Sequence, residues 1–298
     1  MKYQDIISRI VNNDLKDDII QLTDAMHAKV FLHNKEPKLI IKLLLGDQLQ
    51  KEEFRSNLFN SIYREDNLTS LIYKYGLTEM KDVTFTYSIL SYLIGSPVSE
   101  YPNDELTKQI VDGVYAFTKR LEAASGEYTD LGIPHSLQIF EYFLSNSADS
   151  LMKEKLKEIL QDEKFVMYLS KEEKYLFHGD LWFANILINE DTISIIDVEP
   201  LFFGPKNMQL AILISAYFLL TKILLDGNDH IDFNYIISLW HEEVHKEEIL
   251  YLMLSFPIFI GMGKEQSFLE APVDNETYSN IMNPLYSVID WIQSKLKK

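Results

Sequence analysis

The sequence predicts an α+β fold with two lobes, a small N-terminal lobe with a β-sheet plus a helix and a large, mainly α-helical C-terminal lobe. Strand-like segments separated by turn residues are concentrated before residue 98. From residue 103 onward, apolar side chains recur at helical spacing. A Gly-Ser-Pro turn that begins at Gly95 separates the two patterns. We therefore expect one lobe at 1–95 and the other at 96–298, a division that the length of 298 residues allows.

The small lobe is expected to contain a β-hairpin and a further pair of strands. Residues 29–33 and 39–44 are rich in apolar side chains and flank a turn at 34–37 that contains Asn and Pro. Residues 83–98 predict a strand pair that runs into a Gly-Pro turn. The apolar spacing at 4–20 predicts one or two short helices before the first strand.

The large lobe is expected to consist of helices whose apolar stripes form its core. The first of these helices begins near residue 103. Further helices are expected at 135–147, 149–161, 171–176, 205–226, 232–254 and 275–297. The longest apolar run, Leu210 to Leu225, is short for a membrane span and contains Lys222, which favours a buried helix.

Charge and cysteine content narrow the classes of function. The net charge is −17, and residues 99–298, with 32 acidic and 16 basic side chains, carry −16 of it. Nucleic acid is not expected as a partner, because phosphate binding needs clustered Lys and Arg. The acidic lobe would attract cationic small molecules, although the same charge could serve solubility alone. The chain has no Cys and begins without an apolar signal core, so we expect a cytoplasmic protein without a membrane partner.

The strongest functional signal lies at 177–205, with the sequence F-H-G-D-L-W-F-A-N-I-L-I-N-E-D-T-I-S-I-I-D-V-E-P-L-F-F-G-P. Asp180 lies five residues before Asn185, the spacing of the kinase catalytic loop, in which the Asp accepts a hydroxyl proton and the Asn holds Mg²⁺. Two apolar β-branched runs around 189–192 predict a hairpin that brings Asp197 beside Asn185. A lone Asp on a loop is usually a turn residue, so the joint pattern carries the prediction of phosphoryl transfer.

With H-G-D-x-x-x-x-N followed by I-I-D and Gly-Pro, this segment resembles the aminoglycoside phosphotransferase and choline kinase superfamily. The variants H-G-D-L-W and F-F-G are most similar to the fructosamine kinase branch. The resemblance implies a two-lobed, protein-kinase-like fold and transfer of the γ-phosphate of ATP to a hydroxyl group. The acceptor would be an amino sugar, aminoglycoside, amino alcohol or fructosamine-type molecule, and it could be cationic. Asp180 would act as the catalytic base with Asn185, and Asn185 and Asp197 would hold Mg²⁺.

The resemblance also implies a phosphate anchor in the small lobe. Lys42 lies inside an otherwise apolar strand, where a charge requires a partner, and the phosphates of ATP would supply one. In the family this lysine pairs with a Glu on the next helix. Glu53 is the expected partner and Glu52 is the alternative. Either acid could instead be a solvated residue in the first helical turn.

The adenine site is expected at the end of the segment that precedes the lobe boundary. The resemblance places it at the main chain of Ser91, Tyr92 and Leu93. Tyr92 could equally be a core residue.

Two departures from the family pattern bear on activity. Residues 22–29 contain no Gly where the family has a glycine-rich or Ser/Asn-bearing loop. Thr23, His27, Lys29 and main-chain groups would then contact the phosphates, or nucleotide binding would be weaker. Gln209 stands where the family has an Asp that braces the catalytic loop. Glutamine can accept a hydrogen bond but carries no charge. A second hypothesis is therefore a degenerate kinase that binds a nucleotide or a partner without turnover.

A remote alternative of another reaction class is a zinc hydrolase. His241, Glu242 and His245 spell H-E-x-x-H, which on a helix would place two imidazoles on one face. The motif is short and no third ligand is evident, so phosphoryl transfer is preferred. The sequence does not predict an oligomeric state.

Overall fold

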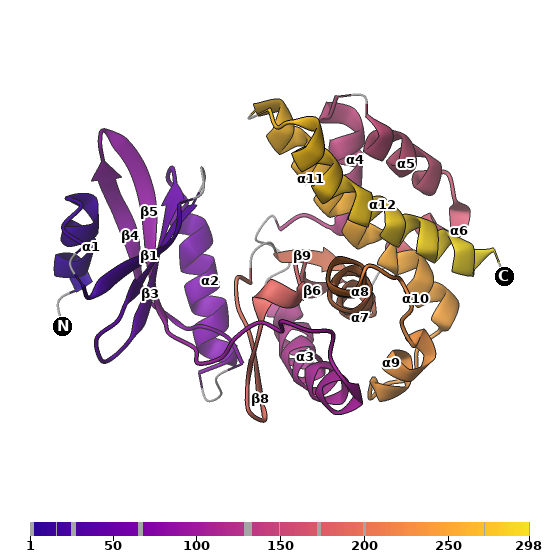
Figure 1. Cartoon of the computed structure of the whole chain (residues 1–298), viewed down its shortest axis with the longest axis horizontal. Coiled ribbons are helices and arrows are strands. Elements are labelled where there is room, and N and C mark those ends of the chain that lie inside the picture. The colour runs from indigo at the N-terminus through magenta and orange to yellow at the C-terminus, as the bar shows by residue number, and fades with distance from the viewer. Residues whose placement is uncertain are drawn as a thin grey trace. The chain divides into compact units, whose positions relative to one another are not determined.

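In a computed structural model, the chain forms two compact units, Met1–Ile94 and Gly95–Lys298. The structure describes residues 3–15, 17–24, 28–64, 68–127, 133–148, 150–171, 174–198, 201–270 and 272–297. Figure 1 shows a β-sheet with helices in the first unit and a mainly helical second unit. The predicted α+β fold class is therefore confirmed.

The first unit contains a five-stranded antiparallel sheet in the order β1-β2-β3-β5-β4. The strands are β1 (Ile19–Asp24), β2 (Ala28–His33), β3 (Leu39–Leu45), β4 (Ile72–Met80) and β5 (Val83–Ser91). The hairpin predicted at 29–44 is confirmed as β2 and β3. The predicted strand pair at 83–98 is wrong, because β5 is a single strand whose hairpin partner is β4. Only the first part of the helical prediction at 4–20 holds, since β1 begins at Ile19.

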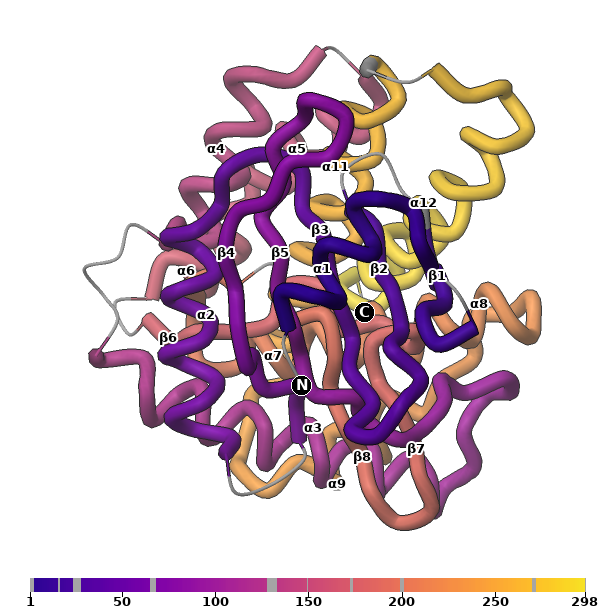
Figure 2. Tube along the Cα trace, turned by 90° about the vertical axis from the view of Figure 1, so that its left-hand side faces the viewer, coloured from indigo at the N-terminus to yellow at the C-terminus, as the bar shows by residue number. Residues whose placement is uncertain are grey.

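Helices lie on both faces of this sheet (Figures 1 and 2). Helix α1 (Tyr3–Val11) contributes Ile6, Ile7 and Ile10 to a core that also contains alternate residues of β3, namely Leu39, Ile41 and Leu43. Because side chains alternate along a strand, Lys42 points to the opposite face. That face is the one on which α2 (Leu49–Ile62) lies.

The second unit is built mainly from helices. They are α3 (Asp104–Ala124), η1 (Ser125–Glu127), α4 (Ser136–Asn146), α5 (Leu151–Leu160), α6 (Glu163–Leu169), η2 (Phe183–Asn185), α7 (Met208–Ile212), η3 (Leu213–Leu220), α8 (Thr221–Asp226), α9 (Phe233–Leu239), α10 (Lys246–Met253), α11 (Ser255–Glu270) and α12 (Asn275–Leu296). The predicted helix at 171–176 is wrong, because a strand begins at Tyr175. The single helix expected at 232–254 is divided into α9 and α10, and α11 was not expected.

Two short antiparallel ribbons carry the sequence segment singled out above. Strand β6 (Tyr175–His178) pairs with β9 (Leu201–Gly204). Strands β7 (Ile186–Asn189) and β8 (Thr192–Ile195) form the predicted hairpin, which is confirmed. Helix α3 packs against both β6 and β8. The two ribbons therefore hold this segment against helix α3.

The apolar run that begins at Leu210 is helical and mostly buried, as predicted, although Leu224 and Leu225 at its end are exposed. The helical stretch Met208–Asp226 has the length and composition of a membrane span, but 78% of its apolar window is covered by protein. Its central part, η3, has π-helical hydrogen bonding, and all eight of its residues are buried. Burial of this kind is typical of the central helix of a folded unit.

Helix α4 begins at an imidazole cap. The His135 Nδ1 atom accepts a hydrogen bond from the Leu137 N–H (3.2 Å), and the Gln138 side chain accepts one from the His135 N–H (2.8 Å). Burial, and then the charge of Lys174, lower the pKa of His135. The cap requires an unprotonated Nδ1, so the neutral imidazole is the form that stabilises this helix.

We predict that this cap makes stability depend on pH. Because folding lowers the pKa of His135, its stabilisation is complete above the ordinary value of about 6.5 and is lost as the pH falls below it. Asparagine caps helices without titrating, so His135→Asn should lose about 1 kcal/mol less than wild type between about pH 7.5 and 5.5. Urea unfolding at both pH values measures this difference. Identical losses in the two proteins would contradict the assignment.

Candidate active site

The loop after β6 places Asp180 and Asn185 in contact. The Asn185 Nδ2 atom donates to the main-chain oxygen of Asp180 (2.8 Å) and to its Oδ2 atom (3.3 Å). The turn closes through η2, in which the Asn185 N–H donates to the Trp182 oxygen (3.0 Å). Asn185 is buried, and its amide nitrogen is engaged by Asp180. Its Oδ1 atom is thus the end of the amide that could serve as a metal ligand.

His178 ties this loop to the segment that precedes Asp197. Its Nδ1 atom accepts from the Asp180 N–H (3.2 Å), and its Nε2 atom lies 3.3 Å from the Ile196 oxygen. Since Nδ1 accepts, the neutral ring carries its proton on Nε2 and donates to that oxygen. The Ile196 N–H in turn donates to the Asn185 oxygen (2.9 Å). His178 is fully buried, so its ring acts as a scaffold between the two segments.

Asp197 follows these contacts in a left-handed backbone conformation. Its φ is 55°, a region that Asp and Asn tolerate better than most residues, and its side chain is exposed. Its negative charge is close enough to raise the pKa of Asp180. The structure therefore brings together Asp180, Asn185 and Asp197, the three residues that the sequence motif predicted to converge.

The surroundings of Asp180 change the acidity of its carboxyl group. Burial first, and then repulsion by Asp197, raise the pKa of Asp180 to about 6. The Asn185 hydrogen bond and the positive charge of Lys264 on α11 oppose this shift. A base whose pKa lies nearer to neutrality accepts a proton more readily than an ordinary aspartate does.

Gln209 occupies the position of the expected bracing residue and contacts the catalytic loop. Its Oε1 atom accepts from the His178 N–H (2.8 Å), and its Nε2 atom donates to the His178 oxygen (3.3 Å). The side chain is 1% exposed. A glutamine can pair with both the donor and the acceptor of one peptide segment, which a carboxylate cannot do. The loop is therefore braced here without a buried charge.

In the first unit, the acid that faces the sheet is Glu52. It is fully buried, accepts a hydrogen bond from the Ser88 hydroxyl, and pairs with Arg55, which is 4% exposed. Ser88 lies directly opposite Lys42 in the β3–β5 register, on the same face of the sheet. Glu53, the partner expected for Lys42, is exposed. Glu52 therefore replaces Glu53 as our candidate for the glutamate that acts with Lys42.

Substitution of the two neighbouring glutamates should separate their roles. Glu52→Gln leaves the buried guanidinium of Arg55 without its counter-charge and should lower the free energy of unfolding by roughly 3 kcal/mol or more. Glu53→Gln, a matched change at an exposed position, should stay within about 0.5 kcal/mol of wild type. Urea unfolding at neutral pH measures both. Equal losses of unfolding free energy in the two variants would show that the buried pair of Glu52 with Arg55 does not stabilise the fold.

The remaining nucleotide-binding candidates stay predictions. The Ser91 N–H donates to the Leu71 oxygen, and the Ser91 hydroxyl accepts from the Leu71 N–H (both 2.9 Å). Tyr92 lies beneath the Lys38 ammonium group, 5.4 Å from its ring centre, and Leu93 is buried. In the segment expected to contact phosphates, Thr23 is exposed and lies on β1, and Lys29 lies on β2, while His27 is outside the described residues.

The helix required by the zinc alternative is absent at its motif. Helix α9 ends at Leu239 and α10 begins at Lys246, so His241 and His245 do not share a helical face. The His241 Nε2 atom contacts the Asp112 carboxylate (2.8 Å), and Glu242 pairs with Lys119 and Lys206. Among the described residues there is no cluster of three or more His, Asp or Glu that could hold a metal. The geometry thus contradicts a helical H-E-x-x-H site.

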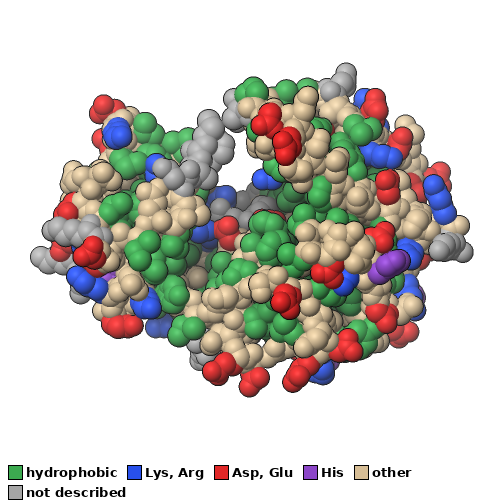
Figure 3. Space-filling model, in the orientation of Figure 1, with side chains coloured by type: hydrophobic (Ala, Val, Ile, Leu, Met, Phe, Trp, Pro, Cys, Tyr) green, Lys and Arg blue, Asp and Glu red, His purple; other side chains and the backbone are tan. Residues whose placement is uncertain are grey.

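Acidic side chains of the second unit are distributed rather than gathered. On the face in Figure 3, Asp and Glu are spread over the helical unit with Lys and Arg among them. Several acids pair with lysines, as in Lys164–Glu247 (2.6 Å) and Lys171–Glu248 (2.7 Å). The net charge therefore acts here as a diffuse field.

Comparisons with known proteins place this fold. No protein-family model matches the sequence, and no curated protein matches it. Among solved structures, the chain is similar to amicoumacin kinase hAmiN in complex with AMP-PNP, Ca²⁺ and Ami, with a TM-score of 0.69 and 11% identity over 98% of this chain and 94% of that one. It is also similar to choline kinase from Streptococcus pneumoniae, with a TM-score of 0.63 and 13% identity over 97% and 98% of the two chains. Aminoglycoside phosphotransferase APH(4)-Ia gives a TM-score of 0.62 and 12% identity over 98% and 99%.

Identities this low establish the fold alone. The chain has the two-lobed, protein-kinase-like fold that these phosphotransferases and choline kinase share. The similarity extends over nearly the whole chain and so includes both units.

Proposed function

We propose that the protein is a kinase that transfers the γ-phosphate of ATP to a hydroxyl group of a small molecule. The observation that carries this proposal is the direct contact of Asn185 with Asp180, together with the electrostatic proximity of Asp197. These residues offer a base and two oxygen ligands in one loop cluster. The similarity of the fold to several small-molecule kinases supports the same reaction class.

Each residue has a distinct role in this proposal. Asp180 accepts the proton of the acceptor hydroxyl and orients it. The carboxylate of Asp197 and the amide oxygen of Asn185 are donors of the type that Mg²⁺ prefers, so they would hold the ion. A bound Mg²⁺ would neutralise charge on the phosphates. In the first unit, Lys42 would anchor the α- and β-phosphates, and Glu52 would be its partner.

The class of acceptor is inferred from the kinases of similar fold and from the charge of the second unit. The proteins of similar fold include a choline kinase and an aminoglycoside phosphotransferase. We therefore propose an amino sugar, aminoglycoside, amino alcohol or fructosamine-type acceptor. The net charge of −16 on residues 99–298 favours a cationic one. A degenerate kinase that binds ATP without turnover is the second candidate, favoured by the absence of Gly from residues 22–29.

Substitution of Asp197 tests the metal assignment. Asparagine keeps the left-handed backbone but removes the charge, so Asp197→Asn should weaken Mg-ATP binding at least about tenfold. In thermal unfolding at saturating Mg-ATP, the variant should show a smaller rise in Tm than wild type. With ATP and EDTA, the two proteins should show the same small rise. An unchanged response to Mg-ATP would exclude Asp197 as a metal ligand.

A further inference from the structure

An open pocket lies in the second unit where the connection between α4 and α5 meets the end of α11 and the start of α12. Helix α11 packs against each of the other three helices (Figure 1). The volume of this pocket is about 390 Å³. Sites for small molecules usually occupy roughly 300–1,000 Å³, so the pocket has room for one.

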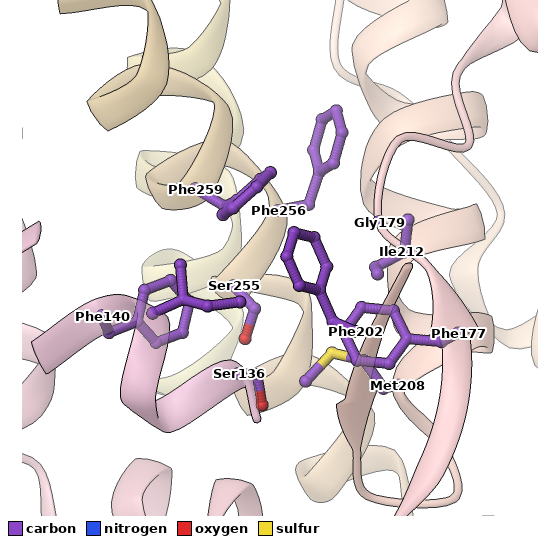
Figure 4. Close-up of a pocket in the computed structure, with 11 residues that line it drawn as sticks. Ser136, Phe140, Phe177, Gly179, Phe202, Met208, Ile212, Ser255, Phe256 and Phe259 are labelled. Carbon is purple, nitrogen blue, oxygen red and sulfur yellow. The ribbon is translucent and has the colours of Figure 1, made fainter. Parts of the chain in front are cut away.

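A second pocket, beside the catalytic loop, lacks this room. Gly179 forms part of its wall, and five phenylalanine rings from α4, β6, β9 and α11 form most of the rest (Figure 4). The buried hydroxyl groups of Ser136 and Ser255 lie among these rings. The volume of the pocket beside Gly179 is about 20 Å³, which is space for about one water molecule. A small-molecule ligand therefore fits only the larger pocket of the two.

Glu265 on α11 gives the larger pocket a negative charge. Its Oε1 atom accepts a hydrogen bond from the Tyr278 hydroxyl (3.0 Å), and its Oε2 atom accepts one from the Ser150 hydroxyl. The described residues that line the pocket include no Lys, Arg or His. The ammonium group of Lys153 donates to the Ser147 oxygen, and Lys153 is not part of the lining. The two hydroxyls therefore hold the carboxylate in place, and no basic side chain within the pocket compensates its charge.

Apolar and aromatic side chains lie around this carboxylate. The ring centres of Phe268 and Tyr278 are 5.6 Å apart with the ring planes at 58°, and Leu269 adds an exposed apolar surface. The face of an aromatic ring attracts a cation. A metal ion would require several oxygen ligands, and the described residues contain no cluster of three or more His, Asp or Glu. The pocket is therefore suited to an organic cation with an apolar body.

We propose that this pocket binds a primary ammonium group attached to an apolar body. The site is additional to the proposed kinase function and does not depend on it. The ammonium group would donate to the carboxylate lone pairs of Glu265 that Ser150 and Tyr278 leave open. The rings of Phe268 and Tyr278 would contact the apolar body and attract the charge. The net charge of −16 on residues 99–298 would raise the local concentration of such cations.

Butylammonium and 1-butanol test the site without requiring turnover, because they are similar in size and differ in charge. In NMR titrations of the full-length protein, butylammonium should shift the amide signals of Gln266 and Leu269 and bind at least about tenfold more tightly than 1-butanol. Glu265→Gln keeps the shape of the side chain but removes its charge, so it should weaken butylammonium at least about tenfold and leave 1-butanol unchanged. Glu276→Gln, the same change at an exposed position of α12, should leave both Kd values unchanged. Equal affinity for the two probes, or unaltered butylammonium binding in Glu265→Gln, would overturn the proposal.

A second pair of variants changes the ring and keeps the carboxylate. Phe268→Leu should reduce the preference for butylammonium over 1-butanol about threefold, because leucine keeps much of the apolar contact but has no ring face. Phe268→Tyr should keep the preference of wild type. An unchanged preference in Phe268→Leu would contradict the role of the ring.

Competition with the acceptor distinguishes the two sources of such an ammonium group. If the group belongs to the acceptor, butylammonium should inhibit phosphoryl transfer competitively with the acceptor at concentrations near its Kd. If the group belongs to a separate amine, bound butylammonium should leave the KM of the acceptor unchanged. The absence of phosphoryl transfer to any acceptor would overturn the kinase proposal, while selective butylammonium binding would still support this site.

Discussion

The Asp180→Asn variant is expected to lose phosphoryl transfer by about a hundredfold or more while becoming more stable than wild type. The loss follows because asparagine cannot accept the hydroxyl proton. The gain follows because the native fold holds a carboxylate that is partly buried and repelled by Asp197, which raises its pKa from 3.8 to about 6. That shift corresponds to as much as about 3 kcal/mol at neutral pH.

The sign of the stability effect depends on pH. Folding raises the pKa of Asp180, so the native state binds its proton more tightly and wild-type stability falls as the pH rises from about 4 through about 6. The advantage of Asp180→Asn should therefore appear at about pH 8 and vanish near pH 4. Urea unfolding in EDTA measures it without metal.

A matched change provides the control. Asp191→Asn, at the exposed turn of the β7–β8 hairpin, should alter neither turnover nor stability. Near-full turnover in Asp180→Asn would exclude it as the base. A loss of stability at about pH 8 would show that its carboxylate is stabilised rather than strained by its surroundings.

The Gln209→Leu variant is expected to lose both stability and activity. Leucine has a similar volume but removes two buried hydrogen bonds to the main chain of His178, at a cost of roughly 2–4 kcal/mol. Because His178 links Asp180 to the segment of Asp197, kcat should fall at least about tenfold while KM for ATP changes less.

The same substitution at an exposed glutamine separates this effect from helix propensity. Gln266→Leu on α11 should remain within about 0.5 kcal/mol of wild type and keep full activity. Unfolding curves measure the stability of the two variants, and initial rates measure their activity. A Gln209→Leu protein as active as wild type would show that the brace is dispensable.

The catalytic loop and its hairpin could be predicted from sequence because their signals are local. The spacing of Asp180 and Asn185 and the two β-branched runs before Asp197 lie within twenty residues, and the structure joins them by short-range contacts. The β2–β3 hairpin was predictable for the same reason. By contrast, β4 was not predicted, although it pairs with β5. Its Lys, Gly, Thr and Glu residues do not alternate clearly with apolar ones, so the sequence carries no clear strand pattern there.

Other features depend on tertiary packing that a sequence pattern does not record. Helix α11 contains Pro257, Gly261 and Gly263, which argue against a helix. A Cβ at Gly261 would lie 2.3 Å from the Met152 side chain, so this glycine permits α5 to approach. On α2 the buried stripe includes Glu52 and Arg55, so hydrophobic periodicity could not show which glutamate faces the sheet.

The pocket beside Gly179 had no sequence signal at all. Its phenylalanines come from four elements, of which β6, β9 and α11 were not expected. Ser136 and Ser255 are 119 residues apart in the chain, and nothing local marks either as buried. A cavity of this kind is thus visible only after folding.

The most direct test of the account is the transfer of labelled γ-phosphate from ATP to a pool of amino sugars, aminoglycosides, choline, fructosamines and other amino alcohols. We predict a phosphorylated product that requires Mg²⁺, forms with wild type and Asp191→Asn, and is lost with Asp180→Asn. Mg-ATP binding by a well-folded wild type without product from any acceptor, or product formation unaffected by Asp180→Asn, would contradict the assignment of a catalytic kinase.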